Sequence, residues 1–316
     1  MKCRRNVLEA IGATPLVRLN RVCTGLDAEF YVKLESQNPG GSFKDRIALS
    51  MVETAEREGL LKPGGTIVEA TAGNTGVGLA LVAAVRGYRA VFVMPDKMSQ
   101  EKVRLLRAYG ADVVITRTVP PDDPDYYQTV AARLARETPG AWYSDQFSNP
   151  ANPATHARST GPEIWDDTGG AIDVFVTGMG TTGLVTGTGR YLKERKPSVR
   201  VVAVDPEGSV LSGGEPHPYK IEGIGGDKVP SIFDAGVVDE MIRISDGEAF
   251  HMARRLAREE GILSGGSTGA IVSGALRYAR DHALARGTVV VMVICDTGRN
   301  YLSKIYSDEW MSEQGF

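Results

Sequence analysis

Short runs rich in β-branched residues alternate with longer amphipathic stretches, and this alternation restricts the fold more than any other feature of the sequence. The expected strands cover residues 30–34, 66–70, 90–94, 112–116, 174–177, 199–205 and 289–294. The expected helices cover residues 47–58, 75–86, 99–109, 129–137, 184–195, 248–260 and 268–286. Alternation of this kind is typical of buried parallel strands with helices on both faces, so the pattern predicts a doubly wound α/β protein.

Composition excludes several classes of function. A formal net charge of −3 leaves no excess of Lys and Arg to neutralise a nucleic acid backbone, so no nucleic acid partner is expected. No apolar run reaches the roughly 18 residues of a membrane span, and no secretory segment begins the chain, so we expect a cytoplasmic protein without a membrane partner. The three cysteines lack metal-ligand spacing, and no metal site is expected.

Glycine-rich turns precede several of the expected helices, and the first contains a lysine. Residues 38–46 read Asn-Pro-Gly-Gly-Ser-Phe-Lys-Asp-Arg, which places Lys44 in the first helical turn. The partial positive charge of a helix N-terminus disfavours a protonated amine there. A neutral amine is the nucleophile that a Schiff-base lysine needs. Taken alone, Lys44 could equally be a solvated lysine balanced by Asp45.

The second turn, residues 69–78, follows an expected strand and opens a helix. Its backbone N–H groups form a concavity suited to a carboxylate, and the Thr71 and Thr75 hydroxyls and the Asn74 amide add directional hydrogen bonds. An ordinary strand-to-helix turn is the alternative.

The third turn, residues 177–183, contains Gly-x-Gly-x-x-Gly at Gly178, Gly180 and Gly183. Asp205 ends the next expected strand about twenty residues later, as in a dinucleotide-binding fingerprint, which on its own suggests NAD. The same backbone cradle can hold a single phosphate monoester, because it senses the anion and not the rest of the ligand.

Two hydroxyl-bearing segments complete the set of candidates. Thr297 follows the last expected strand and could present its hydroxyl to a heterocyclic nitrogen, or could simply form a local Thr turn. Residues 264–269, Ser-Gly-Gly-Ser-Thr-Gly, begin another helix and could line the same crevice or merely cap that helix.

Together these motifs resemble the cysteine synthase and cystathionine β-synthase family of fold type II pyridoxal phosphate enzymes. The resemblance extends from residues 11–19 to residues 299–304. It implies pyridoxal 5'-phosphate as cofactor and Lys44 as the catalytic residue that forms the internal aldimine. It further implies a phenolic-oxygen contact from Asn74, a phosphate loop of Gly178, Gly180, Thr181, Thr182 and Gly183, and Thr297 at the pyridine nitrogen. The substrate carboxylate would be surrounded by Thr71, Ala72, Gly73, Thr75 and Gln146.

The implied reaction is β-replacement, in which Lys44 removes the α-proton and a sulfur nucleophile adds to an α-aminoacrylate intermediate. We expect formation of L-cysteine from O-acetyl-L-serine, or another activated serine, and sulfide. Cystathionine formation from serine and homocysteine is the alternative within the family, in amino-acid biosynthesis and transsulfuration. The alternatives outside the family are an NAD-dependent oxidoreductase and a binding protein for a phosphate metabolite. Phe147, Gly223 and Gly226 are the expected acceptor-side residues, and Phe147 and Gly226 stand where cystathionine enzymes usually carry tyrosines.

The resemblance also implies a domain organisation and several departures from the family pattern. A smaller, mobile domain would span residues 41–148 and a larger one residues 1–40 and 149–316, with the cofactor in the cleft between them. We expect a homodimer without a haem extension or a regulatory module. Ala72 replaces a usual serine, Leu184 a threonine and Thr182 a glycine, which makes an altered donor substrate plausible.

Overall fold

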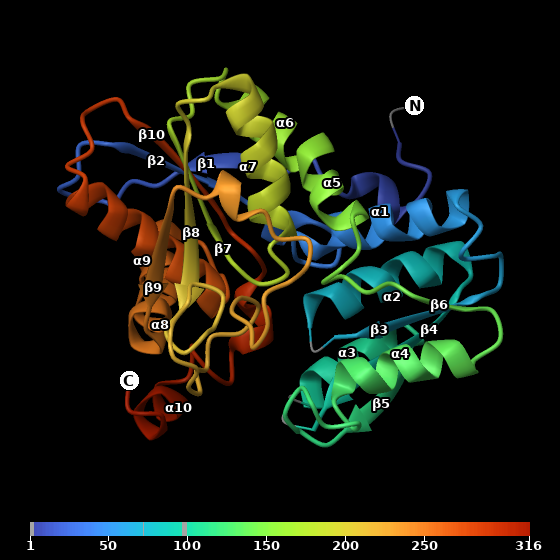
Figure 1. Cartoon of the computed structure of the whole chain (residues 1–316). Helices are drawn as coiled ribbons and strands as arrows, with labels where there is room; N and C mark the ends of the chain where they lie inside the picture. Colours follow the sequence, from blue (N-terminus) through green and yellow to red (C-terminus); the bar gives the residue numbers. More distant parts are fainter. Residues whose placement is uncertain (1–2, 72, 97–99) are drawn as a thin grey trace. The chain divides into compact units, whose positions relative to one another are not determined.

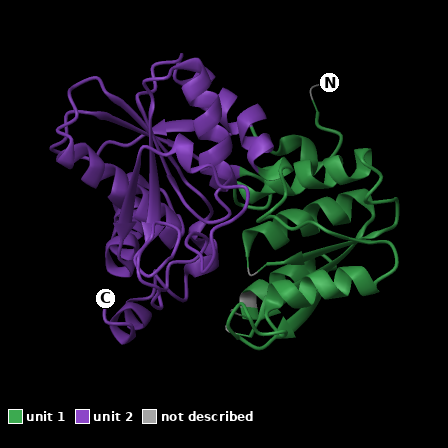
Figure 2. Ribbon diagram, in the orientation of Figure 1, with its two compact units in different colours: residues 1–12, 38–152 green, residues 13–37, 153–316 purple. Residues whose placement is uncertain are grey.

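The computed structural model describes residues 3–71, 73–96 and 100–316, and the chain divides into two compact units (Figure 2). Unit 1 comprises residues 1–12 and 38–152, and unit 2 comprises residues 13–37 and 153–316. Each unit has its own sheet, so each is described separately.

Unit 1 contains a four-stranded parallel sheet in the order β5-β4-β3-β6 (Figure 1). Its strands are β3 (Thr66–Ala70), β4 (Arg89–Pro95), β5 (Asp112–Thr116) and β6 (Ala141–Tyr143). Its helices are α1 (Lys44–Arg57), α2 (Asn74–Arg86), α3 (Gln100–Ala108) and α4 (Tyr127–Glu137), preceded by the short helix η1 (Val7–Ala10). Successive strand residues point to opposite faces. Ile67 therefore packs with α1 and α2, whereas Val68 packs with α4.

Unit 2 contains a six-stranded sheet in the order β1-β2-β10-β7-β8-β9, parallel except for β1. Its strands are β1 (Leu16–Arg18), β2 (Glu29–Lys33), β7 (Val174–Gly178), β8 (Arg200–Pro206), β9 (Glu240–Ile244) and β10 (Val289–Val293). Its helices are α6 (Thr160–Asp167), α7 (Gly183–Arg195), α8 (Asp246–Arg255), α9 (Gly266–Asp281) and α10 (Asp308–Glu313). Figure 1 shows α8 and α9 on one face of this sheet and α6 and α7 on the other.

The α/β architecture expected from the alternating pattern is confirmed. Each expected strand appears as β2, β3, β4, β5, β7, β8 or β10, with its ends shifted by at most one residue. The expectation of burial is wrong for β5, because this strand lies at the edge of its sheet and leaves Val114 and Ile115 exposed. The expected helix 268–286 ends earlier, at Asp281. The pattern missed β1, β6, β9, α5 (Ala151–Arg158), α6 and α10, most of which are too short for a periodicity to be read.

The division into units differs from the expected domain boundaries. The expected small domain, residues 41–148, lies within unit 1, but unit 1 also contains residues 1–12, 38–40 and 149–152. The physical reason is packing: Leu8 and Ala151 are buried in the same core cluster as Ile47, and Ile11 packs against it. The chain passes from one unit to the other after residues 12, 37 and 152, and the third of these points lies in the proline-containing connector and inside α5.

Candidate active site

Lys44 is the first residue of α1 and is buried, with 7% of its surface exposed. Gly41 adopts a left-handed backbone, with φ +84°, which glycine adopts without strain and which turns the loop into the helix. The backbone N–H of Lys44 donates to the Ser42 hydroxyl at 3.2 Å. Its ammonium nitrogen lies 4.5 Å from the centre of the Phe43 ring. Burial against an aromatic ring excludes the alternative in which Lys44 is a solvated surface lysine.

A glycine in α2 brings the first turn of α1 close to that helix. A Cβ on Gly78 would lie 2.9 Å from the Cβ of Ala48 and 3.1 Å from the carbonyl oxygen of Lys44. Such contacts are closer than side chains normally make, so only glycine permits this approach. The first turns of α1 and α2, which carry Lys44 and Asn74, therefore belong to one packed layer of unit 1.

The turn between β3 and α2 and the segment after β6 bring together the residues expected around a carboxylate. Thr75 donates its hydroxyl proton to the side-chain oxygen of Gln146 at 2.6 Å, and both residues are buried. The Thr71 hydroxyl accepts a hydrogen bond from the N–H of Gly73 at 3.3 Å. Asn74 is the first residue of α2. Ala72, expected in the same set, lies outside the described residues.

Glu69 is a fully buried carboxyl beneath this turn, and the sequence reasoning assigned it no role. Burial raises its pKa to about 7, and the nearby Asp145 acts in the same direction. Three donors act against the shift: the Ser144 hydroxyl at 2.6 Å, the N–H of Gln146 at 3.1 Å and the N–H of Ala70 at 2.8 Å. The signal in the sequence was a charged residue within an expected strand whose other residues are uncharged.

In unit 2 the expected phosphate loop runs from the end of β7 into α7. A Cβ on Gly178 would lie 2.5 Å from the Cγ2 of Ile224, and one on Gly180 would lie 3.1 Å from the carbonyl oxygen of Gly223. Both glycines therefore let the loop lie against residues 223–224. Thr182 has φ +65°, a left-handed backbone that is strained for a β-branched residue and natural for the glycine that the family resemblance implies at this position.

The structure gives the Thr297 hydroxyl a local partner. Its oxygen accepts a hydrogen bond from the N–H of Arg299 at 3.4 Å, which is the turn that the sequence left open as an alternative. Ser267, in the first turn of α9, differs: it is 1% exposed, and no described residue forms a hydrogen bond with its hydroxyl. That hydroxyl lies 3.6 Å from the position of a Cβ on Gly223. The structure thus brings Gly180, Gly223 and Ser267 into one part of unit 2.

The remaining expected site residues lie on irregular segments. Gly223 is exposed and has φ +93°, and Phe147 is partly exposed in the turn after β6. Gly226 donates its N–H to the Ser209 hydroxyl at 3.1 Å. A Cβ there would meet Leu211 only at 3.5 Å, so the position has room for a side chain to begin.

Asp205, the acidic residue of the dinucleotide fingerprint, is enclosed by its own loop. Its carboxylate is fully buried and accepts a hydrogen bond from the N–H of Ser212 at 2.9 Å. Burial raises its pKa. A ribose hydroxyl could reach this carboxylate only if the loop that covers it moved away, so the geometry does not favour a dinucleotide.

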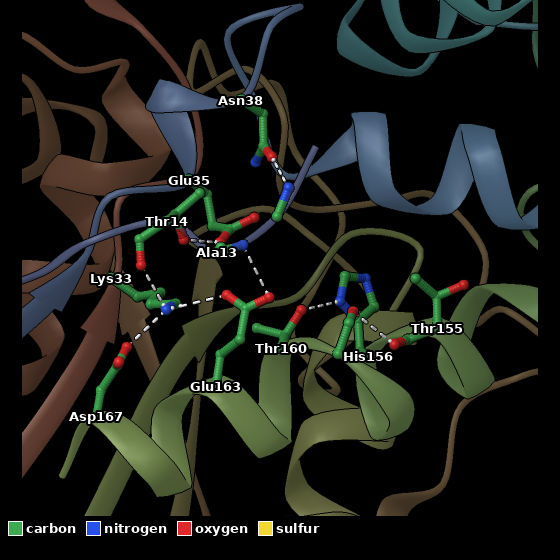
Figure 3. A network of polar contacts seen from close by, with 12 residues as sticks. Ala13, Thr14, Lys33, Glu35, Asn38, Thr155, His156, Thr160, Glu163 and Asp167 are labelled. Carbon is green, nitrogen blue, oxygen red and sulfur yellow. Dashed lines mark hydrogen bonds and ion pairs between the residues drawn. The ribbon is translucent and has the colours of Figure 1, made fainter. Parts of the chain in front are cut away.

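A second buried lysine, Lys33 at the end of β2, belongs to a structural network in unit 2 (Figure 3). Its ammonium group lies 2.7 Å from the Asp167 carboxylate and 3.0 Å from that of Glu163, and it donates to the carbonyl oxygen of Thr14 at 2.6 Å. Glu163 also accepts from the N–H of Ala13. Because two carboxylates from α6 neutralise this lysine, it links β2 to α6 and is not a second candidate nucleophile.

Comparison with known proteins identifies the family. The family model described as "Pyridoxal-phosphate dependent enzyme" matches residues 7–296, which is most of the chain. The chain belongs to this family. It is therefore a pyridoxal phosphate enzyme of fold type II, and the oxidoreductase alternative drawn from Gly-x-Gly-x-x-Gly is wrong.

Its relatives carry two related names. A cysteine synthase of Staphylococcus aureus is 47% identical over 300 residues, covering 94% of this chain and 95% of that protein. A cystathionine beta-synthase of Apis mellifera is 46% identical over 323 residues, covering 100% of this chain but only 64% of the longer protein. The structure of an O-acetylserine dependent cystathionine beta-synthase from Helicobacter pylori matches with a TM-score of 0.91 and 39% identity, covering 97% of this chain and 100% of that one. These relatives support β-replacement chemistry.

Residues 3–71, 73–96 and 100–316 contain neither a membrane-spanning helix nor a cluster of metal-binding side chains. No helix there combines the length and the hydropathy needed to cross a membrane. Histidines, cysteines and carboxylates in that part of the chain form no group of three or more that could hold a metal ion.

Proposed function

We propose that this enzyme forms L-cysteine from O-acetyl-L-serine and sulfide. The observation that carries the proposal is the end-to-end match to a cysteine synthase, joined to a buried lysine at the start of α1. In this reaction acetate leaves the β-carbon with the electrons of the C–O bond, sulfide adds at that carbon, and the α-proton is removed and then returned.

The residues of the chain fit pyridoxal phosphate. Gly178 and Gly180 let the loop before α7 lie against residues 223–224, and the backbone N–H groups at the start of α7 suit a phosphate. The buried hydroxyl of Ser267, which has no partner among the described residues, is costly to bury unless a ligand atom bonds to it. We propose that Ser267, rather than Thr297, bonds to the pyridine nitrogen.

Lys44 is proposed to bind the cofactor and to act as general base. When bound, pyridoxal phosphate supplies an aldehyde that takes up the donor's amino group and a ring that accepts electrons as the α-proton leaves. The Lys44 amine accepts that proton, and its buried position keeps water away from it. Ser267 lies in the first turn of α9, where the helix dipole disfavours a positive charge on the pyridine nitrogen. Such a site would make a bound ring a weaker electron sink, which would suit β-elimination.

The donor's carboxylate is assigned to unit 1. Thr71, Thr75 and Gln146 carry hydroxyl and amide donors within one turn and the segment bonded to it. The backbone N–H groups at the start of α2 add the positive end of a helix dipole. We propose that Asn74 bonds to the phenolic oxygen of the cofactor from the same turn, as the family resemblance implies.

Steady-state assays with three pairs of substrates test the function. We expect O-acetylserine with sulfide to give a higher kcat/KM than O-phosphoserine with sulfide or serine with homocysteine. Borohydride reduction followed by peptide mass spectrometry should place a pyridoxyl group on Lys44. Faster turnover of serine with homocysteine would replace cysteine synthesis by cystathionine synthesis as the function. An unmodified Lys44 peptide would show that Lys44 does not bind the cofactor.

Cystathionine formation is the second candidate, because a 46% identical relative carries that name. The C-terminal segment Ser307-Asp308-Glu309-Trp310-Met311 resembles cystathionine enzymes. In the structure this segment packs against the rest of unit 2, with the centre of the Trp310 ring 5.7 Å from that of the Phe250 ring. It therefore does not favour homocysteine. On the resemblance alone we also propose that the enzyme is a cytoplasmic homodimer.

The two hydroxyl candidates can be separated by substitution. Ser267→Ala removes a hydrogen bond to the cofactor, which is worth about 0.5–1.5 kcal/mol, so the dissociation constant of pyridoxal phosphate should rise about 2- to 12-fold. Thr297→Ala is the matched control and should change it less than about 2-fold, because its hydroxyl oxygen serves its own turn. Titration of each apoenzyme with pyridoxal phosphate measures the two dissociation constants. A larger effect for Thr297→Ala would return the role to that residue.

A further inference from the structure

We propose that Glu69 is a positioning residue that holds Gln146, and through it Thr75, in the geometry that binds the substrate carboxylate. The proposal rests on the proposed function, because it takes Gln146 and Thr75 to be the carboxylate-binding side chains. It concerns contacts within unit 1 only.

The contacts of Glu69 join the end of β3 to the segment after β6. One carboxylate oxygen accepts from both the Ser144 hydroxyl and the Gln146 N–H, and the other accepts from the N–H of Ala70. A charged group hydrogen-bonded on both oxygens inside the protein fixes its donors more firmly than a neutral acceptor would. Glu69 therefore sets where residues 144–146 lie relative to β3.

The segment needs such an anchor because its middle residue is strained. Asp145 has φ +42°, a left-handed backbone that non-glycine residues rarely adopt. Glu69 bonds to the residue on either side of it, Ser144 and Gln146. A strained backbone persists only where neighbouring contacts hold it in place. Here the Glu69 carboxylate supplies two of those contacts.

The anchored residue is the one that contacts the expected carboxylate-binding turn. The side-chain oxygen of Gln146 accepts the Thr75 hydroxyl proton at 2.6 Å. With that oxygen occupied, the amide nitrogen is the part of Gln146 that can donate to a carboxylate. Moving Gln146 would therefore disturb its own amide donor and also the Thr75 hydroxyl that is bonded to it.

The charge of Glu69 can also change near neutral pH. Asp145 and Tyr143 are titratable groups that interact electrostatically with it. Burial raises its pKa to about 7, so the carboxyl is protonated below that pH and ionised above it. A protonated carboxyl uses one oxygen as a donor and loses an acceptor position for Ser144 or Gln146. KM for the amino-acid donor should therefore rise as the pH falls from 8 to 6.

Glu69→Gln tests the proposal in the holoenzyme. The amide keeps the shape but has one acceptor oxygen in place of two, so KM for O-acetylserine should rise about 5- to 10-fold while kcat stays within about 2-fold. The rise of KM between pH 8 and pH 6 should also become smaller. Glu56→Gln is the matched control: the same substitution in unit 1, at a glutamate that pairs with Arg86 and Tyr88, should leave KM unchanged. Ser144→Ala, which removes one donor only, should raise KM about 2- to 5-fold and serves if Glu69→Gln does not fold.

Binding of L-alanine, followed by absorbance, separates this proposal from the proposed function. Alanine carries the carboxylate but no leaving group. Its dissociation constant therefore reports carboxylate binding, whichever sulfur nucleophile the enzyme uses. A weaker alanine complex in Glu69→Gln supports the positioning role even if the wild type forms no cysteine. If Glu69→Gln binds alanine as tightly as the wild type, or keeps the wild-type KM and pH profile, the positioning role is overturned. This holds even if the wild type forms cysteine.

Discussion

Lys44→Ala is expected to lower kcat for cysteine formation by at least about 100-fold. A positioned general base contributes about 10²- to 10⁴-fold to a rate, and alanine leaves no amine at the start of α1 to accept the α-proton. The loop proposed to hold the phosphate lies in unit 2 and keeps its backbone donors, so pyridoxal phosphate should still bind. Steady-state kinetics, with the cofactor content measured on the same sample, test both statements.

Two controls separate loss of the amine from loss of structure. Lys62→Ala removes an exposed lysine from the same unit and should leave kcat unchanged. Added ethylamine should restore part of the activity of Lys44→Ala, because a small amine can occupy the space left by the side chain and accept the proton. An alanine variant as active as the wild type would show that another group is the base.

The parts of the candidate site that could be predicted from the sequence are the turns fixed by local backbone chemistry. A glycine-rich turn that opens a helix can be recognised without knowing what surrounds it, because its need for small residues and exposed N–H groups is local. The turns that lead to Lys44, Asn74 and Gly183 are of this kind, and each begins a helix in the structure.

The parts that sequence reasoning missed depend on partners far along the chain. Ser267 and Thr297 are both hydroxyls beside helix or strand ends, and only the structure shows that one has a hydrogen-bond partner while the other is buried without one in the described chain. Glu69 bonds to residues more than 70 positions away. The placement of residues 1–12 in unit 1 likewise follows from the packing of Leu8 against α1 and α2, which no local pattern contains.

The packing of α8 against α9 also fixes where Ser267 lies. We therefore expect Gly269→Ala to lower the free energy of unfolding. A Cβ on Gly269 would overlap the carbonyl oxygen of Ala249 and lie 2.8 Å from the backbone nitrogen of Ala253, so α8 and α9 would have to separate. Forcing atoms into a packed core typically costs about 1–3 kcal/mol, and the obstacle here is backbone, so we expect about 3 kcal/mol. The midpoint of thermal unfolding should fall by about 6–12 °C. Cofactor affinity should fall too, because α9 carries Ser267 two residues earlier.

Gly247→Ala is the matched control, since it places the same methyl group on α8. There a Cβ would meet only the Phe316 ring, at an ordinary 3.5 Å, and alanine is the better helix former by up to about 1 kcal/mol. Its unfolding midpoint should therefore stay the same or rise slightly. If the two variants unfold at the same temperature, then α9 can shift without cost, and the position of the Ser267 hydroxyl would not be determined by the packing of α8 against α9.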